Sequence, residues 1–168
     1  MTGTQTMTSF GPTASPATAW LRRLALGAFV LCFGVVVLGA YVRLTAAGLG
    51  CPDWPGCYGN ASPTGALAEI RAEEARLPSG PVTHGKAWVE MIHRYLATGV
   101  GVLITTLMIA TWLQRRRGLA VSPWWPTFTL AWVCLQGAFG ALTVTMKLFP
   151  AIVTLLSLIH ISEPTRRS

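Results

Sequence analysis

Long uncharged stretches alternate with short charged segments along this chain. The three uncharged runs are Leu24–Val42, Tyr95–Leu113 and the stretch from about residue 126 to residue 146. A helix needs about 20 consecutive apolar residues to cross the hydrocarbon core of a bilayer, and each run is close to that length. The pattern therefore predicts three membrane-spanning helices.

Composition and charge placement agree with this interpretation. Of the 168 residues, 52% are hydrophobic and 11% are charged, whereas soluble domains carry about 25% charged residues. The formal net charge is +7, but the basic residues lie at the ends of the predicted helices and form no patch suited to nucleic acid. Arg22 and Arg23 precede the first run, and Arg115–Arg117 follow the second. Because Lys and Arg in short loops mark the cytoplasmic side, we expect the N-terminus inside and the loop of residues 45–86 outside, in the periplasm.

The chain outside the three runs is less regular. Residues 1–19 are uncharged and rich in Thr, Ser, Ala and Pro, which predicts a disordered cytoplasmic N-terminus. A mitochondrial transit peptide would be rich in Arg, so we expect a bacterial inner (plasma) membrane. Residues 20–154 form the predicted membrane bundle. A fourth apolar run begins near residue 149 and stops after about a dozen residues, too few to cross a bilayer.

The predicted outer loop contains a short helix and two cysteines. Leu67, Ile70 and Leu77 recur at roughly helical spacing, which predicts a surface helix lying on the membrane or on the bundle. Cys51 and Cys57 can close a small ring, and an oxidising periplasm favours a disulfide. Free thiols are the alternative, whereas a zinc site would need two more soft ligands nearby.

An ionisable cluster directly precedes the second apolar run. Glu90 and His93 share a helix face, and Arg94 follows. Charged groups beside a membrane-length apolar run are costly to place, so they indicate a functional site. A neutral imidazole is a natural axial ligand of haem iron, and a guanidinium can pair with haem propionates. The sequence therefore predicts that His93 and Arg94 bind haem.

Each of these residues also has a structural interpretation. His93 can pack between helices with its ring bonded to a backbone carbonyl. Glu90 can interact favourably with the helix dipole, and the Arg94 side chain can extend to the headgroups. At the level of function, two alternatives stay open: a b-type cytochrome that carries electrons, and a membrane bundle that relays protons without enzymatic activity.

Five segments, in this order, resemble the haem A synthase family. They are Arg43–Thr45, Gly48–Cys57, Glu90–Arg94, Gln136-Gly137 with Gly140, Thr143 and Val144, and Pro150–Thr154. The resemblance covers about residues 20–154. It implies an all-α polytopic membrane bundle, half of an eight-helix architecture built from two similar four-helix bundles. This chain would supply three full transmembrane helices and a truncated fourth.

The resemblance implies a membrane oxidoreductase that oxidises a methyl group of haem O to the formyl group of haem A for cytochrome oxidase. It implies haem O and haem A as substrate and product, and a haem b in the second bundle. Haem O synthase and cytochrome oxidase assembly factors would be partners within the lipid bilayer. His93 would be a haem-iron ligand and Glu90 the catalytic carboxylate, with Cys51 and Cys57 as the outer-loop pair.

The chain departs from the family pattern near its end. The family's fourth helix continues Val-Thr-Leu-His and supplies a second histidine, whereas here Val153-Thr154 is followed by Leu155-Leu156-Ser157. We therefore expect residues 155–168 to be a non-native tail. We also expect this chain to be an incomplete fragment that is inactive by itself.

Overall fold

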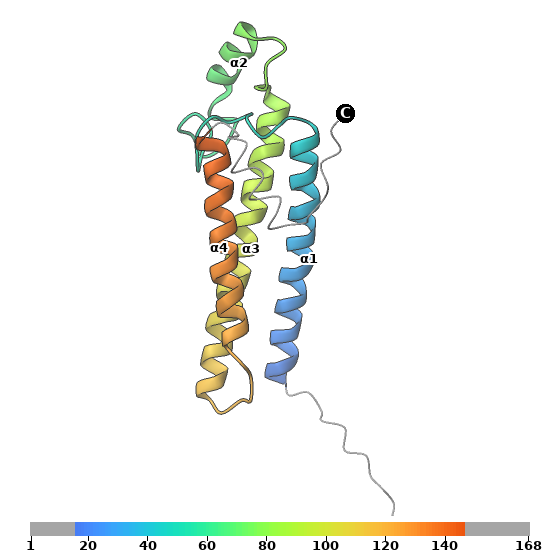
Figure 1. The fold of residues 1–168 in the computed structure, drawn as a ribbon, viewed down its shortest axis with the longest axis vertical. Helices are drawn as coiled ribbons and strands as arrows, with labels where there is room; N and C mark the ends of the chain where they lie inside the picture. The colour runs from blue at the N-terminus through green and yellow to red at the C-terminus, as the bar shows by residue number, and fades with distance from the viewer. Residues whose placement is uncertain (1–15, 147–168) are drawn as a thin grey trace, which may run out of the picture.

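A computed structural model describes residues 16–146, which form four helices and no strand (Figure 1). The helices are α1 (Pro16–Leu44), α2 (Leu67–Arg76), α3 (His84–Arg116) and α4 (Trp124–Thr145). In length and composition, α1, α3 and α4 could each cross a membrane. The three predicted spans and the all-α membrane bundle are thus confirmed. The fourth apolar run, the residue 155–168 tail and residues 1–15 lie outside the described residues.

The helices extend beyond the uncharged runs because polar residues form their end turns. The helix α1 begins at Pro16, so residues 16–19, expected to be disordered, are helical. In α3 the Thr83 side chain accepts a hydrogen bond from the Lys86 N–H at 3.2 Å, which caps the first turn. His84, which we expected in the loop, is the first residue of α3.

The other end of α3 is closed by a glycine. Gly118 has a φ of +87°, a conformation that costs glycine little. The Leu119 N–H donates to the Gln114 carbonyl at 3.0 Å, and the Gly118 N–H donates to the Arg115 carbonyl at 3.0 Å. This pair of bonds is a Schellman motif, and it ends α3 directly after the basic cluster.

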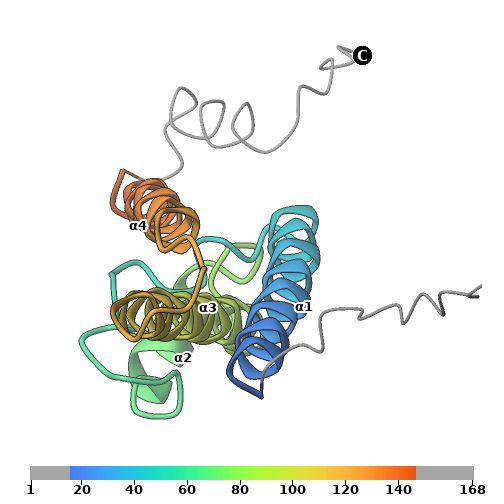
Figure 2. The same ribbon diagram turned by 90° about the horizontal axis from the view of Figure 1, so that it is seen from below.

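The helix α3 is the centre of the bundle. It packs against α1 on one side and α4 on the other, whereas α1 and α4 are not in contact within residues 16–146 (Figure 2). Val100 and Ile104 of α3 are buried against Ala28 of α1. Cys32 of α1 packs against this cluster. Cys134 is exposed on α4.

Two tryptophans join α3 and α4 at the end far from α2. The rings of Trp112 and Trp124 meet edge to face, with centroids 5.8 Å apart. The Trp112 indole N–H also donates to the Thr127 hydroxyl at 3.1 Å. An edge-to-face pair and a satisfied indole donor are both favourable when aromatic rings are packed. These contacts hold the α3–α4 hairpin together.

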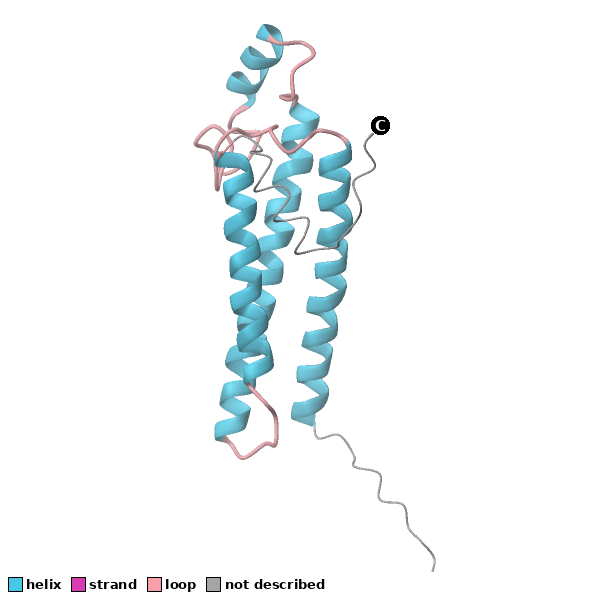
Figure 3. Cartoon of the chain, in the orientation of Figure 1, coloured by secondary structure: helices cyan, strands magenta, loops and turns pink. Residues whose placement is uncertain are grey.

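The loop between α1 and α3 covers one end of the bundle, together with α2 (Figure 3). A buried cluster joins this loop to α2 and to the first turns of α3. Its members are Cys51, Cys57, Ala66, Ile70, Val82, Ala87 and Met91. Of the expected apolar positions on α2, Ile70 is fully buried, whereas Leu77 is 55% exposed. The short helix therefore packs on the bundle through Ile70 and not through a continuous apolar face.

Gly50 lets the loop approach α3 at backbone distance. A Cβ atom at this position would lie 2.7 Å from the Ala87 nitrogen and 2.8 Å from the Lys86 carbonyl carbon. Both atoms belong to backbone and cannot rotate away. A side chain at position 50 would therefore push the loop off the start of α3.

We predict that Gly50→Ala lowers the free energy of unfolding by about 1–3 kcal/mol, the usual cost of overpacking a tight contact. Thermal unfolding in detergent measures it. Gly48→Ala is the matched control, because a Cβ there would meet only the Val42 side chain at an ordinary 3.8 Å. Equal melting temperatures for the two variants would show that the loop does not rest on α3 as described.

Candidate functional site

A disulfide joins Cys51 and Cys57 in the outer loop, with Cα atoms 4.8 Å apart. Both residues have no exposed surface. The disulfide interpretation of this pair is therefore confirmed over free thiols. The ring it closes brings residues 51–57 into one compact unit, which we call the disulfide loop.

Asp53 and a tight turn fix the shape of the disulfide loop. Cys57 and Asn60 exchange two backbone hydrogen bonds, at 2.8 and 3.0 Å. The two residues between them, Tyr58 and Gly59, both have positive φ, as a two-residue turn of this kind requires. The Asp53 carboxylate accepts the Tyr58 and Gly59 N–H groups at 2.6 and 2.7 Å. Burial raises the pKa of Tyr58, and Glu73 and Asp53 raise it further, so its phenol stays protonated.

Glu90 lies beneath the disulfide loop and is only 3% exposed. Its Oε2 atom accepts a hydrogen bond from the Cys51 backbone N–H at 2.9 Å. Its Oε1 atom pairs with the guanidinium of Arg94, one helical turn further along α3. Each carboxylate oxygen therefore has a partner, which is what allows a charged group to remain buried.

The Arg94 guanidinium lies between Glu90 and the disulfide loop. Its Nη1 atom donates to the Asp53 carbonyl at 2.8 Å and to the Gly56 carbonyl at 2.7 Å. Its Nη2 atom pairs with Glu90 and is 3.4 Å from the Cys51 carbonyl. The pairing of Arg94 with haem propionates, expected from the sequence, stays a prediction. The contacts with the loop were not foreseen, because they join residues about 40 positions apart.

His93 faces a different neighbour from Glu90 and Arg94. Its Nε2 atom points at Gly39 of α1, where an added Cβ would lie 2.9 Å away. The Val35 backbone, one turn earlier in α1, also lies near the same imidazole. The imidazole therefore fits into a notch that exists because residue 39 has no side chain. Gly27 and Gly34 have nothing within 4 Å of an added Cβ, so of these three glycines Gly39 is the one that makes a close contact.

The predicted site residues thus form two adjacent groups on α3 and not one cluster. Glu90 and Arg94 meet the disulfide loop, and His93 meets α1. Within residues 16–146, no three His, Cys, Asp or Glu side chains are grouped so as to hold a metal ion. A haem iron differs from a bare ion because the porphyrin supplies four nitrogen ligands and the protein adds only axial ones. A single imidazole in an apolar bundle therefore fits haem better than it fits a free metal ion.

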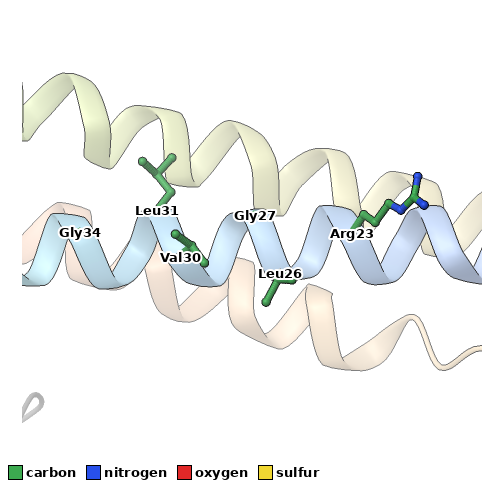
Figure 4. A pocket seen from close by; sticks show the side chains of 6 residues that line it. All are labelled: Arg23, Leu26, Gly27, Val30, Leu31 and Gly34. Carbon is green, nitrogen blue, oxygen red and sulfur yellow. The ribbon is translucent and has the colours of Figure 1, made fainter.

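Two further features lie in the membrane part of the bundle. An open apolar groove of about 600 Å³ follows α1 from Arg23 to Gly34 (Figure 4). On α4, the Oε1 atom of Gln136 is buried without a hydrogen-bond partner within the described residues. A polar atom in this position is costly. Gln136 also belongs to one of the segments that resemble the haem A synthase family.

Comparisons with known proteins identify the family. The family described as "Cytochrome oxidase assembly protein" matches residues 22–161, seven residues beyond the stretch covered by the resemblance above. A protein named "Heme A synthase" from Shewanella oneidensis is 40% identical over 134 residues, covering 80% of this chain and 38% of that protein. Proteins of the same name from Oceanobacillus iheyensis and Chelativorans sp. are 30% and 31% identical, over 76% and 72% of this chain.

The chain spans less than two fifths of the length of these relatives, 38%, 36% and 36% respectively. No solved structure matches the chain significantly. The family match nevertheless covers well over half of the chain, and it includes the disulfide loop and the Glu90–Arg94 segment. With its all-helical membrane fold, the chain therefore belongs to the cytochrome oxidase assembly protein family whose relatives include haem A synthases.

Proposed function

We propose that this chain handles haem O as part of a haem A synthase, the enzyme that oxidises a methyl group of haem O to the formyl group of haem A. The observation that carries the proposal is the buried Glu90 carboxylate, held beside His93 at one end of a membrane helix. Relatives that match this segment are named haem A synthases. A buried carboxylate near an imidazole gives such a site a proton acceptor and an iron ligand.

Glu90 and His93 of α3 would have different roles. His93 would bind the iron of the haem substrate and fix the orientation of the porphyrin, so that the reacting methyl group is presented in one place. Glu90 would accept a proton or stabilise positive charge as the methyl group is oxidised. Each carboxylate oxygen has two lone-pair directions, so a carboxylate that already accepts hydrogen bonds can still accept a proton. A haem b, expected in the second bundle of the whole protein, would supply redox chemistry.

The location of the site supports an outer-face reaction in a bacterial inner membrane. The start of α1, with Arg22 and Arg23, and the end of α3, with Arg115–Arg117, lie at the same end of the bundle (Figure 1). The disulfide loop lies at the opposite end. Because basic residues mark the cytoplasmic side, the disulfide loop would face the periplasm, where disulfides persist. Haem O synthase and oxidase assembly factors are the partners we propose within the lipid bilayer.

The imidazole must leave its present contact to bind iron. Its neighbours there are Gly39 and the Val35 backbone of α1. Losing even a full hydrogen bond would cost only about 0.5–1.5 kcal/mol, which is small beside an iron–nitrogen bond. The notch at Gly39 would therefore hold the ring in place until haem enters.

We predict that His93→Ala in the complete gene product lowers the haem bound per protein at least about tenfold, since a loss of about 1.4 kcal/mol is already tenfold in affinity. The haem content of the purified protein, measured from its pyridine haemochrome spectrum at matched expression, checks this. Gly39→Ala should perturb the same haem spectrum by moving the imidazole, whereas Gly34→Ala should not. Unchanged spectra in His93→Ala would remove the ligand assignment.

We predict that Glu90→Gln leaves haem content within about twofold of wild type but reduces haem A yield at least about tenfold, because removing one acid–base group typically costs 10²–10⁴-fold in rate. The amide keeps the shape and can still accept the Cys51 N–H. Chromatography of extracted haems separates haem O, partly oxidised products and haem A. Full haem A production by this variant is the result that contradicts the proposed role.

A further inference from the structure

The Arg94 guanidinium is hydrogen-bonded to several groups of the protein. Its two terminal nitrogens reach the Glu90 carboxylate and the carbonyls of Asp53 and Gly56, with the carbonyls of Cys51 and Pro55 each at 3.4 Å. The side chain is only 11% exposed. A guanidinium whose terminal donors are directed at protein acceptors is held in a single orientation.

The Glu90 carboxylate is oriented from two sides by the same loop. The Cys51 N–H, in the disulfide loop, donates to Oε2. Arg94, which pairs with Oε1, is itself held by carbonyls of that loop. A free Glu side chain samples many rotamers, and fixing it costs up to about 2 kcal/mol. Here the free-energy cost of fixing the Glu90 side chain is part of the free energy of folding, so it does not arise when the substrate binds.

The disulfide loop can serve as a rigid support because three constraints act on it. The Cys51–Cys57 bond closes the ring. The Asp53 carboxylate binds the backbone N–H groups of Tyr58 and Gly59. The side chains of Cys51 and Cys57 are fully buried in the cluster that includes Met91 of α3. The carbonyls that hold Arg94 lie between the two cysteines, so the ring fixes their directions.

We infer that Arg94 is a positioning residue that acts through Glu90: the disulfide loop holds the guanidinium, and the guanidinium holds the carboxylate in its reactive orientation. This inference rests on the proposed function for the reaction that Glu90 serves. It gives Arg94 a role different from the propionate contact expected from the sequence. It also gives the outer disulfide a role in the chemistry without contact with the substrate.

Lysine cannot replace Arg94 in this arrangement. The guanidinium is a planar fork whose separate nitrogens can reach Glu90 and two carbonyls at once, whereas an ammonium group is a single point. Arg94→Lys therefore keeps the charge beside Glu90 but releases part of the loop. If Arg94 instead bound a haem propionate, Arg94→Lys would preserve that contact, because lysine is also an effective binder of anionic groups.

The experiment compares Arg94→Lys, Glu90→Gln and the double variant in the complete gene product, with Arg76→Lys as the control. Arg76 pairs with Glu73 on the surface and is 78% exposed. The first readout is the rate at which a water-soluble phosphine reduces the Cys51–Cys57 bond in haem-free protein, followed by thiol alkylation and mass spectrometry. The second is haem content, and the third is the fraction of bound haem O converted.

We expect both single variants to speed disulfide reduction about tenfold, since each leaves a buried partner unsatisfied, and Arg76→Lys to leave it unchanged. The double variant should be no faster than the faster single variant, because the two residues act through one contact. Haem content in Arg94→Lys should stay within about twofold of wild type while conversion falls about tenfold. Asp53→Ala loosens the disulfide loop without changing α3. It should also speed reduction of the disulfide and lower the conversion of haem O. It serves as the second variant if an Arg94 variant fails to fold.

Three results would overturn the inference. One is an unchanged reduction rate in Arg94→Lys, which indicates that the guanidinium does not hold the disulfide loop. Another is full conversion by Arg94→Lys. The third is a double variant whose effect on reduction is the product of the two single effects. The proposed function is tested separately by conversion in the wild-type protein, because the reduction rates are measured without haem.

Discussion

The buried ion pair of Glu90 and Arg94 is the interaction on which the outer end of this molecule depends. The two side chains are 4% and 11% exposed, and removing one partner of such a pair typically costs about 3–5 kcal/mol. The pair is stable because each charged group also has hydrogen-bond partners other than the opposite charge. Backbone groups of the disulfide loop satisfy the remaining donors and acceptors, so the loop, the carboxylate and the start of α3 form one unit.

The arrangement of the helices places this unit where haem chemistry could use it. The helix α3 is central, and α1 and α4 flank it without meeting in the described part of the chain. His93 projects toward α1, and Glu90 projects toward the loop. The site therefore has a rigid polar cap above an apolar bundle. Such a division suits a substrate with a hydrophobic ring system and a reaction that develops charge at one edge.

Much of the fold and part of the candidate site could be predicted from the sequence, because the sequence patterns that indicate them are local. Uncharged runs gave the three spans, and charge beside a span pointed to Glu90 and His93. The spacing of Cys51 and Cys57 in a turn-rich segment pointed to a disulfide. These inferences need only composition, length and helical periodicity.

The remaining features depend on contacts between distant parts of the chain. The bonds of Arg94 to the disulfide loop, and the notch that Gly39 offers to His93, join segments that no periodicity relates. A glycine in a membrane helix indicates close packing, but Gly27, Gly34 and Gly39 look alike in the sequence, and one of them receives the imidazole. His84 was assigned to the loop of residues 45–86, whereas α3 begins at His84.

Hydrogen–deuterium exchange of the disulfide loop tests the central claim most directly. In haem-free protein, a peptide spanning residues 49–61 should exchange its buried amides, that of Cys51 above all, as slowly as the first turns of α3. Glu90→Ala and Arg94→Lys should each speed that exchange, while the exchange of α4 stays unchanged. A loop that exchanges as fast as an unstructured peptide in the wild-type protein would contradict the account, because Glu90 would then have no rigid support.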